Sequence, residues 1–408
     1  MSNNSILFEV NQGMYGLPQA GYLAQQKLIE HLRKHQYHQT DTPCLFRHSS
    51  NGTTFALVVD DFGVKYRDKA AAEHLINALQ ELYTIKVDWT GAKYIGFTIQ
   101  FDRQLNTVTL SMPAYIAKVL ERFAPHIQHG APSPSVYTPP SYGAHTQSPT
   151  EDTSEALTPA AAKRIQEIVG SLLFYARGVD ITLLPTVNLL ASLQSSPTEQ
   201  VENIADRLLR YCARYPNNEL VYHACDMTLF IQADASYLSR PKARSVAGGI
   251  CYLSNAAVSS IIPSVVASAA EAEYAALFLL AQDGEYLRQV LANMGYKQAP
   301  TLILCDNQCA VGMASNSVKA KRSKSIDMRY HWIRDRVQQG HFHVQWRKDE
   351  HNLADFFTKP LPAKTHQILM PLLVHTPHSP ATLFRKPSAR RAASWFQTVN
   401  KNQIERVC

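Results

Sequence analysis

Hydrophobic residues in the first third of the chain recur with the spacing of helices in some stretches and of strands in others. Leucines repeat at helical intervals near the start, and a later run rich in Thr, Phe and Val leads into a polar turn, as in a β-hairpin. The predicted elements are a helix at 22–37, a hairpin at 53–66, a helix at 70–83, a hairpin at 93–112 and a helix opening at Pro113. The order α-ββ-α-ββ-α predicts helices on one face of an antiparallel sheet.

The second half of the chain has a different pattern. Residues 160–215 show helical spacing throughout. After them we predict strands at 228–236, 245–253 and 257–263, a helix at 269–294, a strand at 301–307, a helix at 325–339 and a strand at 341–346. The two halves together predict a multidomain protein of the α+β or α/β class.

Two segments lack such patterns. Residues 125–159 carry seven prolines among many Ser, Thr and Gly residues, which predicts an extended connector with no packed face. The end of the chain is basic and without periodicity, which predicts a flexible tail. The predicted bounds are 1–124 for an N-terminal block, 125–159 for the connector, 160–226 for a helical tether, 227–362 for a C-terminal domain and 363–408 for the tail.

Composition limits the class of protein. The chain has 408 residues, a length at which proteins usually divide into two or more domains, each with its own hydrophobic core. Its content of 45% hydrophobic and 18% charged residues is typical of globular proteins. The 40 Lys and Arg exceed the 33 Asp and Glu by a margin that permits a nucleic-acid partner without requiring one. Seven scattered cysteines include no CxxC pair, so neither a disulfide framework nor a structural zinc site is expected.

The N-terminal residues lack the charged and then apolar pattern of a signal peptide. No apolar run approaches the ~20 residues needed to cross a bilayer. We therefore expect a soluble intracellular protein, located in the cytoplasm or the nucleus.

Acidic residues stand at four positions among the predicted strands and helices of the C-terminal half. Asp234 lies inside an apolar strand, where a charge is costly unless it is paired or bound to a metal. Asp306 ends another strand, Asp355 follows the last one, and two glutamates, Glu271 and Glu273, open the long helix. Such acids can converge at one edge of a sheet, and a cluster of carboxylate oxygens suits Mg²⁺. Two ions there could activate a water and stabilise the leaving oxygen of a phosphodiester.

Several stretches in series, ADAS, ASAAEAEYAAL, LCDNQCAV, KSIDMRYHWIRDRV and NLADFFTKPL, make residues 228–362 resemble a ribonuclease H domain. The resemblance is to the domain at the end of Ty1/copia-type retrotransposon polyproteins. It implies a mixed five-stranded sheet with flanking helices. It also implies that Asp234, one of the two glutamates, Asp306 and Asp355 hold two Mg²⁺ ions and cut the RNA strand of an RNA–DNA hybrid.

The two glutamates have different local settings. Ser268 and Glu271 have the spacing of a capping box, which gives Glu271 a structural role. Glu273, one turn inside the helix, matches the family's catalytic position better, and we favour it as the ligand.

Ordinary structural roles compete with the functional ones. Asp306 could cap the next helix, and Asp355 could be a surface turn residue. Asp327 fits a helix N-terminal charge better than a ligand, and His331 fits a packed or surface histidine. His351, beside Asp355, could help to release product, as in some relatives. The basic residues before the helix at 326 could contact phosphates or form a solvated loop; they are Lys319, Lys321, Arg322 and Lys324.

The N-terminal block resembles the reverse transcriptase of the same retroelements. The stretch YGLPQAGYLA and the later LVVDDF carry this resemblance. It implies that Asp60 and Asp61 are part of a metal-binding triad in the polymerase palm, and that Gln19 lines the site of the incoming nucleotide. Residues 1–124 would then be a truncated reverse transcriptase with part of the palm and the start of the thumb, and 160–226 the tether to ribonuclease H.

Two departures from the reverse transcriptase pattern matter. Val58 stands where the family usually has Tyr. The triad needs a third aspartate from an earlier strand, and the one Asp before Asp60 is Asp41, which follows the glutamine motif instead of preceding it. Polymerisation by this chain alone is therefore not expected.

Three functional hypotheses follow. The leading one is a retrotransposon-derived fragment whose C-terminal domain is a Mg²⁺-dependent ribonuclease H, with an RNA–DNA hybrid as partner. The second is a decayed or co-opted remnant that at most binds nucleic acid. The third is a polymerase half that another chain, such as another polyprotein product, completes. An integrase shares the broad fold, but the long helix after three strands and the NLAD segment favour ribonuclease H.

Overall fold

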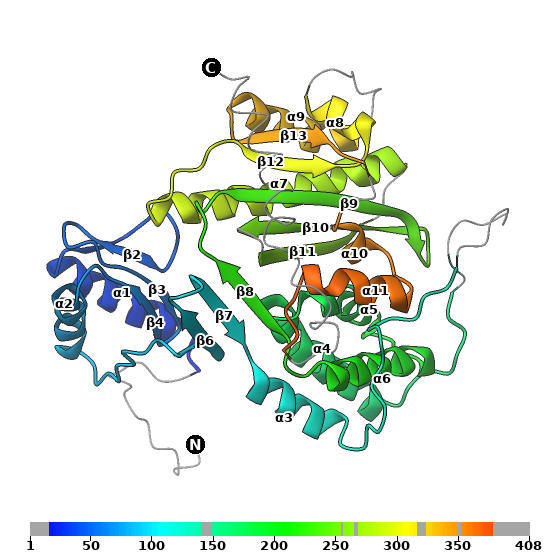
Figure 1. Ribbon diagram of the computed structural model, residues 1–408, viewed down its shortest axis with the longest axis horizontal. Helices are drawn as coiled ribbons and strands as arrows, with labels where there is room; N and C mark the ends of the chain where they lie inside the picture. Colours follow the sequence, from blue (N-terminus) through cyan, green and yellow to red (C-terminus); the bar gives the residue numbers. More distant parts are fainter. Residues whose placement is uncertain are drawn as a thin grey trace, which may run out of the picture. The chain divides into compact units, whose positions relative to one another are not determined.

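The computed structural model describes residues 16–139, 149, 151–253, 256–264, 268–315, 324–348 and 352–377 (Figure 1). The chain divides into two compact units. The first unit is Met1–Ile95 with Ala292–Tyr296, and the second unit is Gly96–Leu291 with Lys297–Cys408.

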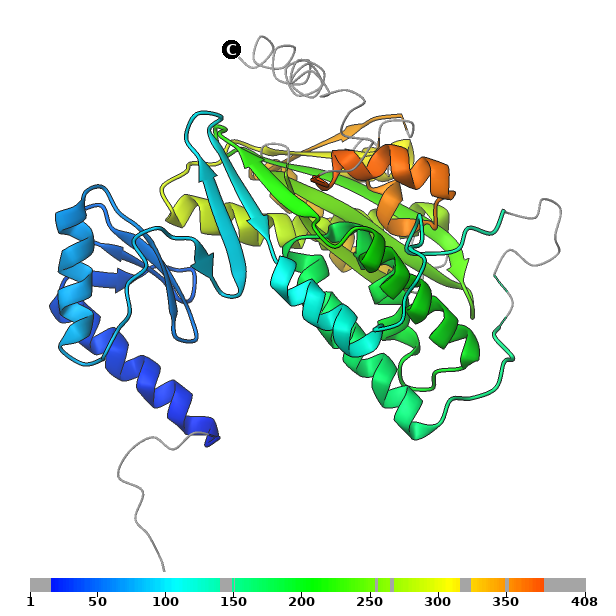
Figure 2. The ribbon, with the colours of Figure 1, turned by 60° about the horizontal axis from the view of Figure 1, so that its bottom comes forward.

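The first unit is a four-stranded antiparallel sheet with two helices packed on it. Its elements are α1 (Pro18–Lys34), β1 (Tyr37–Gln39), β2 (Leu45–His48), β3 (Thr54–Val58), β4 (Asp61–Lys65), α2 (Lys69–Gln80) and β5 (Lys93–Tyr94). The sheet has the order β1-β2-β3-β4. Leu32 of α1 and Leu75 of α2 share one core cluster with Phe46 and Phe55 of the sheet. The prediction of helices on one face of an antiparallel sheet is confirmed for this first part of the chain (Figure 2). It is wrong for the predicted hairpin at 93–112, which belongs to a different sheet.

The prediction missed the β1–β2 hairpin. Its strands are three and four residues long, and exposed His38 and Gln39 break the apolar pattern of the first. These short segments are strands because β2 pairs with β3, a contact that the local sequence does not indicate.

The second unit begins with a three-stranded antiparallel ribbon and a bundle of helices. The ribbon strands are β6 (Phe97–Asp102), β7 (Thr107–Ser111) and β8 (Glu219–His223). The helices are α3 (Pro113–Phe123), α4 (Pro159–Gly178), the 3₁₀ turn Ile181–Leu183, α5 (Leu184–Leu193) and α6 (Glu199–Arg214). Thr158 and Thr198 cap α4 and α6 by accepting hydrogen bonds from backbone amides. The helical prediction for 160–215 is confirmed.

A mixed five-stranded sheet forms the rest of the second unit. Its elements are β9 (Leu229–Arg240), β10 (Arg244–Leu253), β11 (Ala256–Ser264), α7 (Ala269–Asn293), β12 (Thr301–Cys305), α8 (Gln308–Ala314), α9 (Lys324–Gln338), β13 (Phe342–Trp346), α10 (Asp355–Thr358), α11 (Ala363–Leu369) and the 3₁₀ turn Met370–Leu372. The strand order is β11-β10-β9-β12-β13. The first three strands are antiparallel, while β12 runs parallel to β9 and β13 runs parallel to β12. This is the ribonuclease H-like sheet that the sequence led us to expect.

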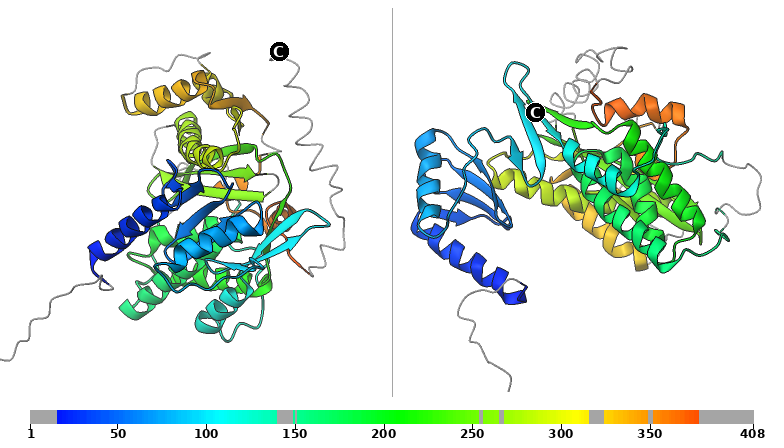
Figure 3. Two further views of the ribbon diagram at one scale, coloured as in Figure 1. Left: turned by 90° about the vertical axis from the view of Figure 1, so that its left-hand side faces the viewer. Right: turned by 90° about the horizontal axis from the view of Figure 1, so that it is seen from below.

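Helices cover both faces of this sheet. Ala272, Ala275 and Ala276 of α7 pack on one face, and Ile250 and Tyr252 on the other face join the core of the helix bundle (Figures 1 and 3). The close approach of α7 requires a glycine in β10. A Cβ on Gly249 would lie 2.0 Å from Leu280 Cδ1 and 2.5 Å from the carbonyl oxygen of Gln232.

Three details of the predicted organisation are wrong. The end of the predicted helical tether contains a strand, because β8 pairs with β7 over a long sequence separation. The connector has a packed face: Ala131 is buried and its amide donates to the carbonyl of Arg210. The described part of the predicted tail, residues 363–377, is packed and not flexible, since Met370, Leu373 and Val374 lie in the helix-bundle core. The predicted domain bounds themselves stay a prediction.

In the described part of the chain, none of the helices has both the length and the apolar character that crossing a membrane requires.

Candidate functional site

Asp234 lies in the middle of β9 and is 1% exposed. Its neighbour across the β9–β10 pair is Gly248. A Cβ on Gly248 would lie 2.7 Å from Thr358 Cγ2, so the missing side chain leaves room for α10 over this point of the sheet. The Thr358 hydroxyl donates a hydrogen bond to Asp234 Oδ2. A polar contact from α10 therefore satisfies one oxygen of this costly buried carboxyl group.

Asp306 follows directly after β12, which runs parallel to β9. The last paired residues are Leu304 and Gln232, so Asp306 leaves the sheet at the end of β12, on the strand next to the one that carries Asp234. Asp306 does not cap the following helix. Asn307 does so, by accepting a hydrogen bond from the Ala310 amide at 3.0 Å. The capping role considered for Asp306 is therefore wrong, and its side chain is available for another purpose.

Glu273 enters the same region from α7. It is 9% exposed, and the backbone amide of Ala235, the residue after Asp234, donates to its carboxylate. Ser268 Oγ accepts a hydrogen bond from the Glu271 amide at 3.2 Å, which is the N-cap contact expected from the sequence. The cap fixes where α7 begins, and one turn of helix then places Glu273 against β9.

Asp355 is the first residue of α10, and Lys359 at the other end of this short helix pairs with it. Lys359 Nζ lies 2.7 Å from Asp355 Oδ1. The segment before α10 is anchored to β9. Asn352 Nδ2 donates to the carbonyl of Ala233 at 2.9 Å, and the Leu353 amide donates to Gln232 Oε1 at 3.2 Å. These two contacts hold Asp355 beside Asp234.

The four carboxyl groups influence one another electrostatically. Burial raises the pKa of Asp234 well above its usual value, and Asp355 and Glu273 raise it further. Burial and then Asp306 raise the pKa of Glu273 to about 8, and burial followed by Asp355 raises the pKa of Asp306. Lys359 lowers the pKa of all three. Four acids that oppose each other's ionisation need protons or cations between them.

Two oxygens of this cluster suit a cation. Glu273 Oε2 and Asp306 Oδ1 are buried and have no hydrogen-bond partner among the described residues. The ligand atoms of Glu273, Asp306 and Cys305 lie within 4.8 Å of one another. Burial raises the pKa of the Cys305 thiol, so it stays protonated and is a poor ligand. The remaining donors are carboxylate oxygens, which fit Mg²⁺ or a similar hard divalent ion.

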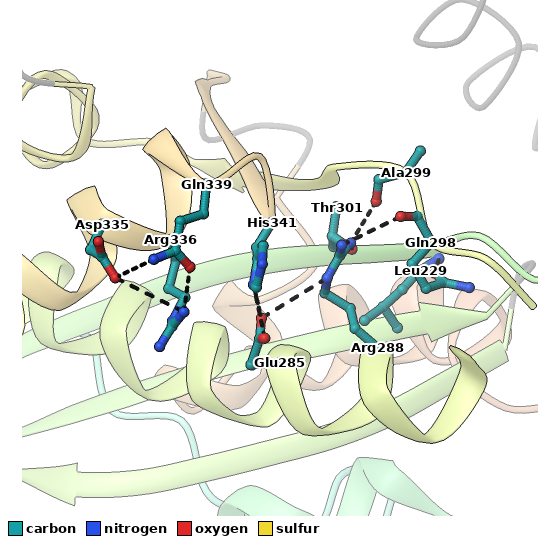
Figure 4. A network of polar contacts seen from close by, with 10 residues as sticks. All are labelled: Leu229, Glu285, Arg288, Gln298, Ala299, Thr301, Asp335, Arg336, Gln339 and His341. Atoms are coloured by element: carbon teal, nitrogen blue, oxygen red, sulfur yellow. Dashed lines mark hydrogen bonds and ion pairs between the residues drawn. The ribbon is translucent and has the colours of Figure 1, made fainter. Parts of the chain in front are cut away.

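A polar network keeps α7 in register with the strands that carry the acids (Figure 4). His341, the residue before β13, has its Nδ1 2.8 Å from Oε1 of Glu285 on α7. Arg288, one turn further along α7, donates to the Ala299 carbonyl at 2.5 Å and to Thr301 Oγ1 at 2.7 Å. Because Glu273 lies on α7 and Asp306 follows β12, these contacts help to set the spacing between the two acids.

Asp60 and Asp61 lie in the first unit, at the tip of the β3–β4 hairpin. Val58 pairs with Asp61, which leaves Val59 and Asp60 as a two-residue turn. Val59 has a φ of 58°, a conformation that costs about 1–3 kcal/mol for a β-branched residue. Both aspartates are exposed, and within the described residues of this unit no third ligand forms a metal-binding group with them. Their role as metal ligands stays a prediction.

The remaining residues singled out in the sequence lie on exposed helix positions or outside the described residues. Gln19 is exposed in the first turn of α1, and His331 is exposed on α9. His351 and the basic residues Lys319, Lys321 and Arg322 lie outside the described residues, as do the side chains of Lys324 and Asp327.

The sequence reasoning missed Thr358 and Lys359. Both belong to the stretch NLADFFTKPL, and the i,i+4 spacing of Asp355 and Lys359 could have indicated their ion pair. The contact of Thr358 with Asp234 had no local signal, because it joins residues far apart in the sequence.

Comparison with known proteins gives matches over most of the chain. Residues 2–135 match the family model described as reverse transcriptase (RNA-dependent DNA polymerase). The Pol polyprotein of transposon TNT 1-94 from Nicotiana tabacum is 26% identical over 90% of this chain and 28% of its own length. The Gag-Pol polyprotein of transposon Ty1-ER2 from Saccharomyces cerevisiae is 23% identical over 91% of this chain and 22% of its own length. The chain thus spans about a quarter of the relatives that it matches.

The chain is also similar to solved structures of reverse transcriptases and ribonucleases H. A foamy viral protease–reverse transcriptase in complex with an RNA/DNA hybrid is 14% identical, with a TM-score of 0.44, over 86% of this chain and 40% of that chain. LC11-RNase H1, isolated from compost by a metagenomic approach, is 16% identical, with a TM-score of 0.28, over 32% of this chain and 93% of that chain.

Proposed function

Because this chain is related to the Ty1/copia-type retrotransposon Pol polyproteins, we propose that its acid cluster hydrolyses the RNA strand of RNA–DNA hybrids. The cluster consists of Asp234, Glu273, Asp306 and Asp355. Residues 227–362 would be the ribonuclease H domain, with two Mg²⁺ ions as cofactors.

One observation carries this proposal: inside a group of four acids, two carboxylate oxygens are buried and have no hydrogen-bond partner in the part of the chain that the structure describes. An unsatisfied buried carboxylate costs more than about 1–3 kcal/mol, so a purely structural role for Glu273 and Asp306 would be expensive. A bound cation would supply the missing contacts. Strand register, a helix cap and a loop anchor bring the acids together independently of one another.

The side chains around the cluster have distinct roles in this proposal. Asp234 and Glu273 form the buried floor, which excludes water and strengthens electrostatic interactions. Asp306 and Asp355 lie nearer to solvent, where phosphate oxygens can reach them. Divalent ions held here would activate a water for attack on phosphorus and stabilise the leaving oxygen. Thr358 holds Asp234 in place, and Lys359 balances the negative charge when no metal is bound.

The test is cleavage of a labelled RNA–DNA hybrid by the purified full chain, with Mg²⁺ or with EDTA. We expect cutting of the RNA strand in Mg²⁺ only, and none by an Asp306→Asn variant with an unchanged circular dichroism spectrum. Duplex DNA of the same sequence is the substrate control. Salt-sensitive binding of the hybrid without cutting would contradict the proposal and support a remnant that binds nucleic acid.

We also propose that Asp60 and Asp61 form part of a polymerase metal site, since they lie in the segment that matches reverse transcriptases. Their exposure at a hairpin tip with a strained Val59 is what supports this proposal. Primer extension on an RNA template should be undetectable for the chain alone if a third carboxylate must come from another polypeptide. Extension by the chain alone would refute that requirement.

A further inference from the structure

Two histidines and a glutamate gather at one place in the first unit, far in sequence from the acid cluster. His31 and His35 are four residues apart on α1, so they face the same side of that helix. Glu81 follows α2, which packs beside α1 on the sheet (Figure 2). One ligand atom of each residue lies within 4.8 Å of the other two.

The distances are those of a nearly assembled metal site. His35 Nε2 lies 3.2 Å and His31 Nε2 lies 3.7 Å from the same Glu81 oxygen, Oε2. The two imidazole rings are 4.8 Å apart between centroids and tilted by 56°. Three donor atoms this close to one another can bind one ion after side-chain adjustment, because metal–ligand distances are near 2.1 Å.

The backbone at this place also favours a cation. His35 is the C-cap of α1 and Glu81 is the C-cap of α2, so two helix C-termini with their partial negative charge converge here. The Ala78 carbonyl, from the last turn of α2, lies 2.6 Å from His31 Nε2.

The donor set selects the kind of ion. Two imidazoles and one carboxylate bind Zn²⁺ well, whereas Mg²⁺ and Ca²⁺ prefer sites made of oxygen alone. Side-chain exposure rises from 10% for His31 through 23% for His35 to 56% for Glu81, which leaves an open side for entry and for a water ligand. We propose that His31, His35 and Glu81 form a zinc site that fastens α1 to α2. No CxxC pair marks this site in the sequence, because its ligands are histidines and a glutamate from two helices.

One competing contact must yield when zinc binds. The hydrogen bond between His31 Nε2 and the Ala78 carbonyl needs a proton on that nitrogen, and a metal needs its lone pair. Zinc therefore binds His31 with its ring proton on Nδ1: a neutral ring shifts the proton from Nε2 to Nδ1, and a doubly protonated ring releases the Nε2 proton to solvent. Next to the site, His74 is already engaged, since its Nδ1 lies 3.0 Å from the Tyr37 hydroxyl. It is therefore not counted among the ligands.

The experiment is a zinc titration of the full chain, stripped with EDTA and then dialysed into excess Mg²⁺. Excess Mg²⁺ reduces zinc binding by sites made of carboxylates alone, and a chromogenic chelator then competes with the remaining sites for Zn²⁺. We expect one equivalent of tight binding, and a Co²⁺ adduct with the visible absorption of a tetrahedral site. Zinc should also raise the thermal unfolding temperature of the first unit.

Three variants complete the design. His35→Ala and Glu81→Gln should weaken zinc binding by more than about tenfold, the least that loss of an outer-shell partner costs. His38→Ala is the matched control, because His38 is exposed on the adjacent strand and outside the site. Glu81 is largely exposed, so its replacement tests the site without threatening the fold. Equal zinc affinity in the wild type, His35→Ala and Glu81→Gln would overturn the proposal, as would no tight binding by the wild type.

Discussion

Asp180 is a fully buried acid in the helix-bundle core of the second unit, and its ionisation should make stability depend on pH. It is 1% exposed and lies directly after α4. Its Oδ1 accepts from the Thr182 amide at 3.1 Å and from the Thr182 hydroxyl at 2.5 Å, and its Oδ2 accepts from Asn218 Nδ2 at 2.6 Å. These donors reduce the cost of burial but do not remove it.

Burial raises the pKa of Asp180 from its usual 3.8 to about 6, although Thr182 and Asn218 lower it. Between these two values the folded chain holds a proton that the unfolded chain has lost. The folded state is therefore stabilised below the unfolded pKa, and this stabilisation is lost as the pH rises through the folded pKa. A shift of about two units corresponds to about 3 kcal/mol.

The assay is denaturant unfolding of the wild type and of Asp180→Asn from about pH 4 to about pH 7, with unfolding followed by circular dichroism. Between these limits the wild type should lose about 2 kcal/mol more than the variant, because part of the two-unit effect lies below pH 4 and Asn carries no charge at either pH. The acid cluster is the same in both proteins, so its contribution to the pH dependence of the unfolding free energy cancels in the difference between them. Asp206→Asn is the matched control, since Asp206 is a surface acid on α6 paired with Arg164. Equal pH slopes for the wild type and Asp180→Asn would refute the reasoning.

Three further predictions concern the acid cluster. Lys359→Met should lower the Mg²⁺ concentration for half-maximal hybrid cleavage, because the ammonium group competes for Asp355; an unchanged or higher concentration would contradict this. Thr358→Val should cost about 1–3 kcal/mol of stability in EDTA and less in saturating Mg²⁺, since the metal would replace the lost hydrogen bond; unfolding curves in the two buffers test this. Gly249→Val should cost at least about 1–3 kcal/mol and abolish cleavage, because its side chain would displace α7; wild-type activity would disprove the close packing.

The sequence drew attention to the C-terminal acids because charges interrupt apolar patterns there. Asp234 stands inside a predicted strand and Asp306 ends another, so their charge and position marked them, and the resemblance to ribonuclease H domains supplied their expected role. The choice of Glu273 over Glu271 followed from recognising Ser268 as a helix cap, and the Ser268 contact is present. In each case the signal was local, within a few residues of the site.

Long-range contacts could not be predicted in the same way. Strand β8 is short and flanked by loops, and only its pairing with β7 makes it a strand. Met370 and Val374 are apolar residues in a segment without periodicity, and their burial depends on the helix bundle that receives them. The gathering of His31 and His35 with Glu81 likewise depends on the packing of α1 beside α2.

The central claim is that this cluster of acids, and not merely an acidic region, cuts RNA. The most direct measurement compares hybrid cleavage in Mg²⁺ by Glu273→Gln and Glu271→Gln, two variants that differ only in which of two neighbouring glutamates is neutralised. We predict that Glu273→Gln loses at least about a hundredfold in rate, while Glu271→Gln stays within a fewfold of the wild type. Equal activity of the two variants, or a greater loss for Glu271→Gln, would contradict the site as described.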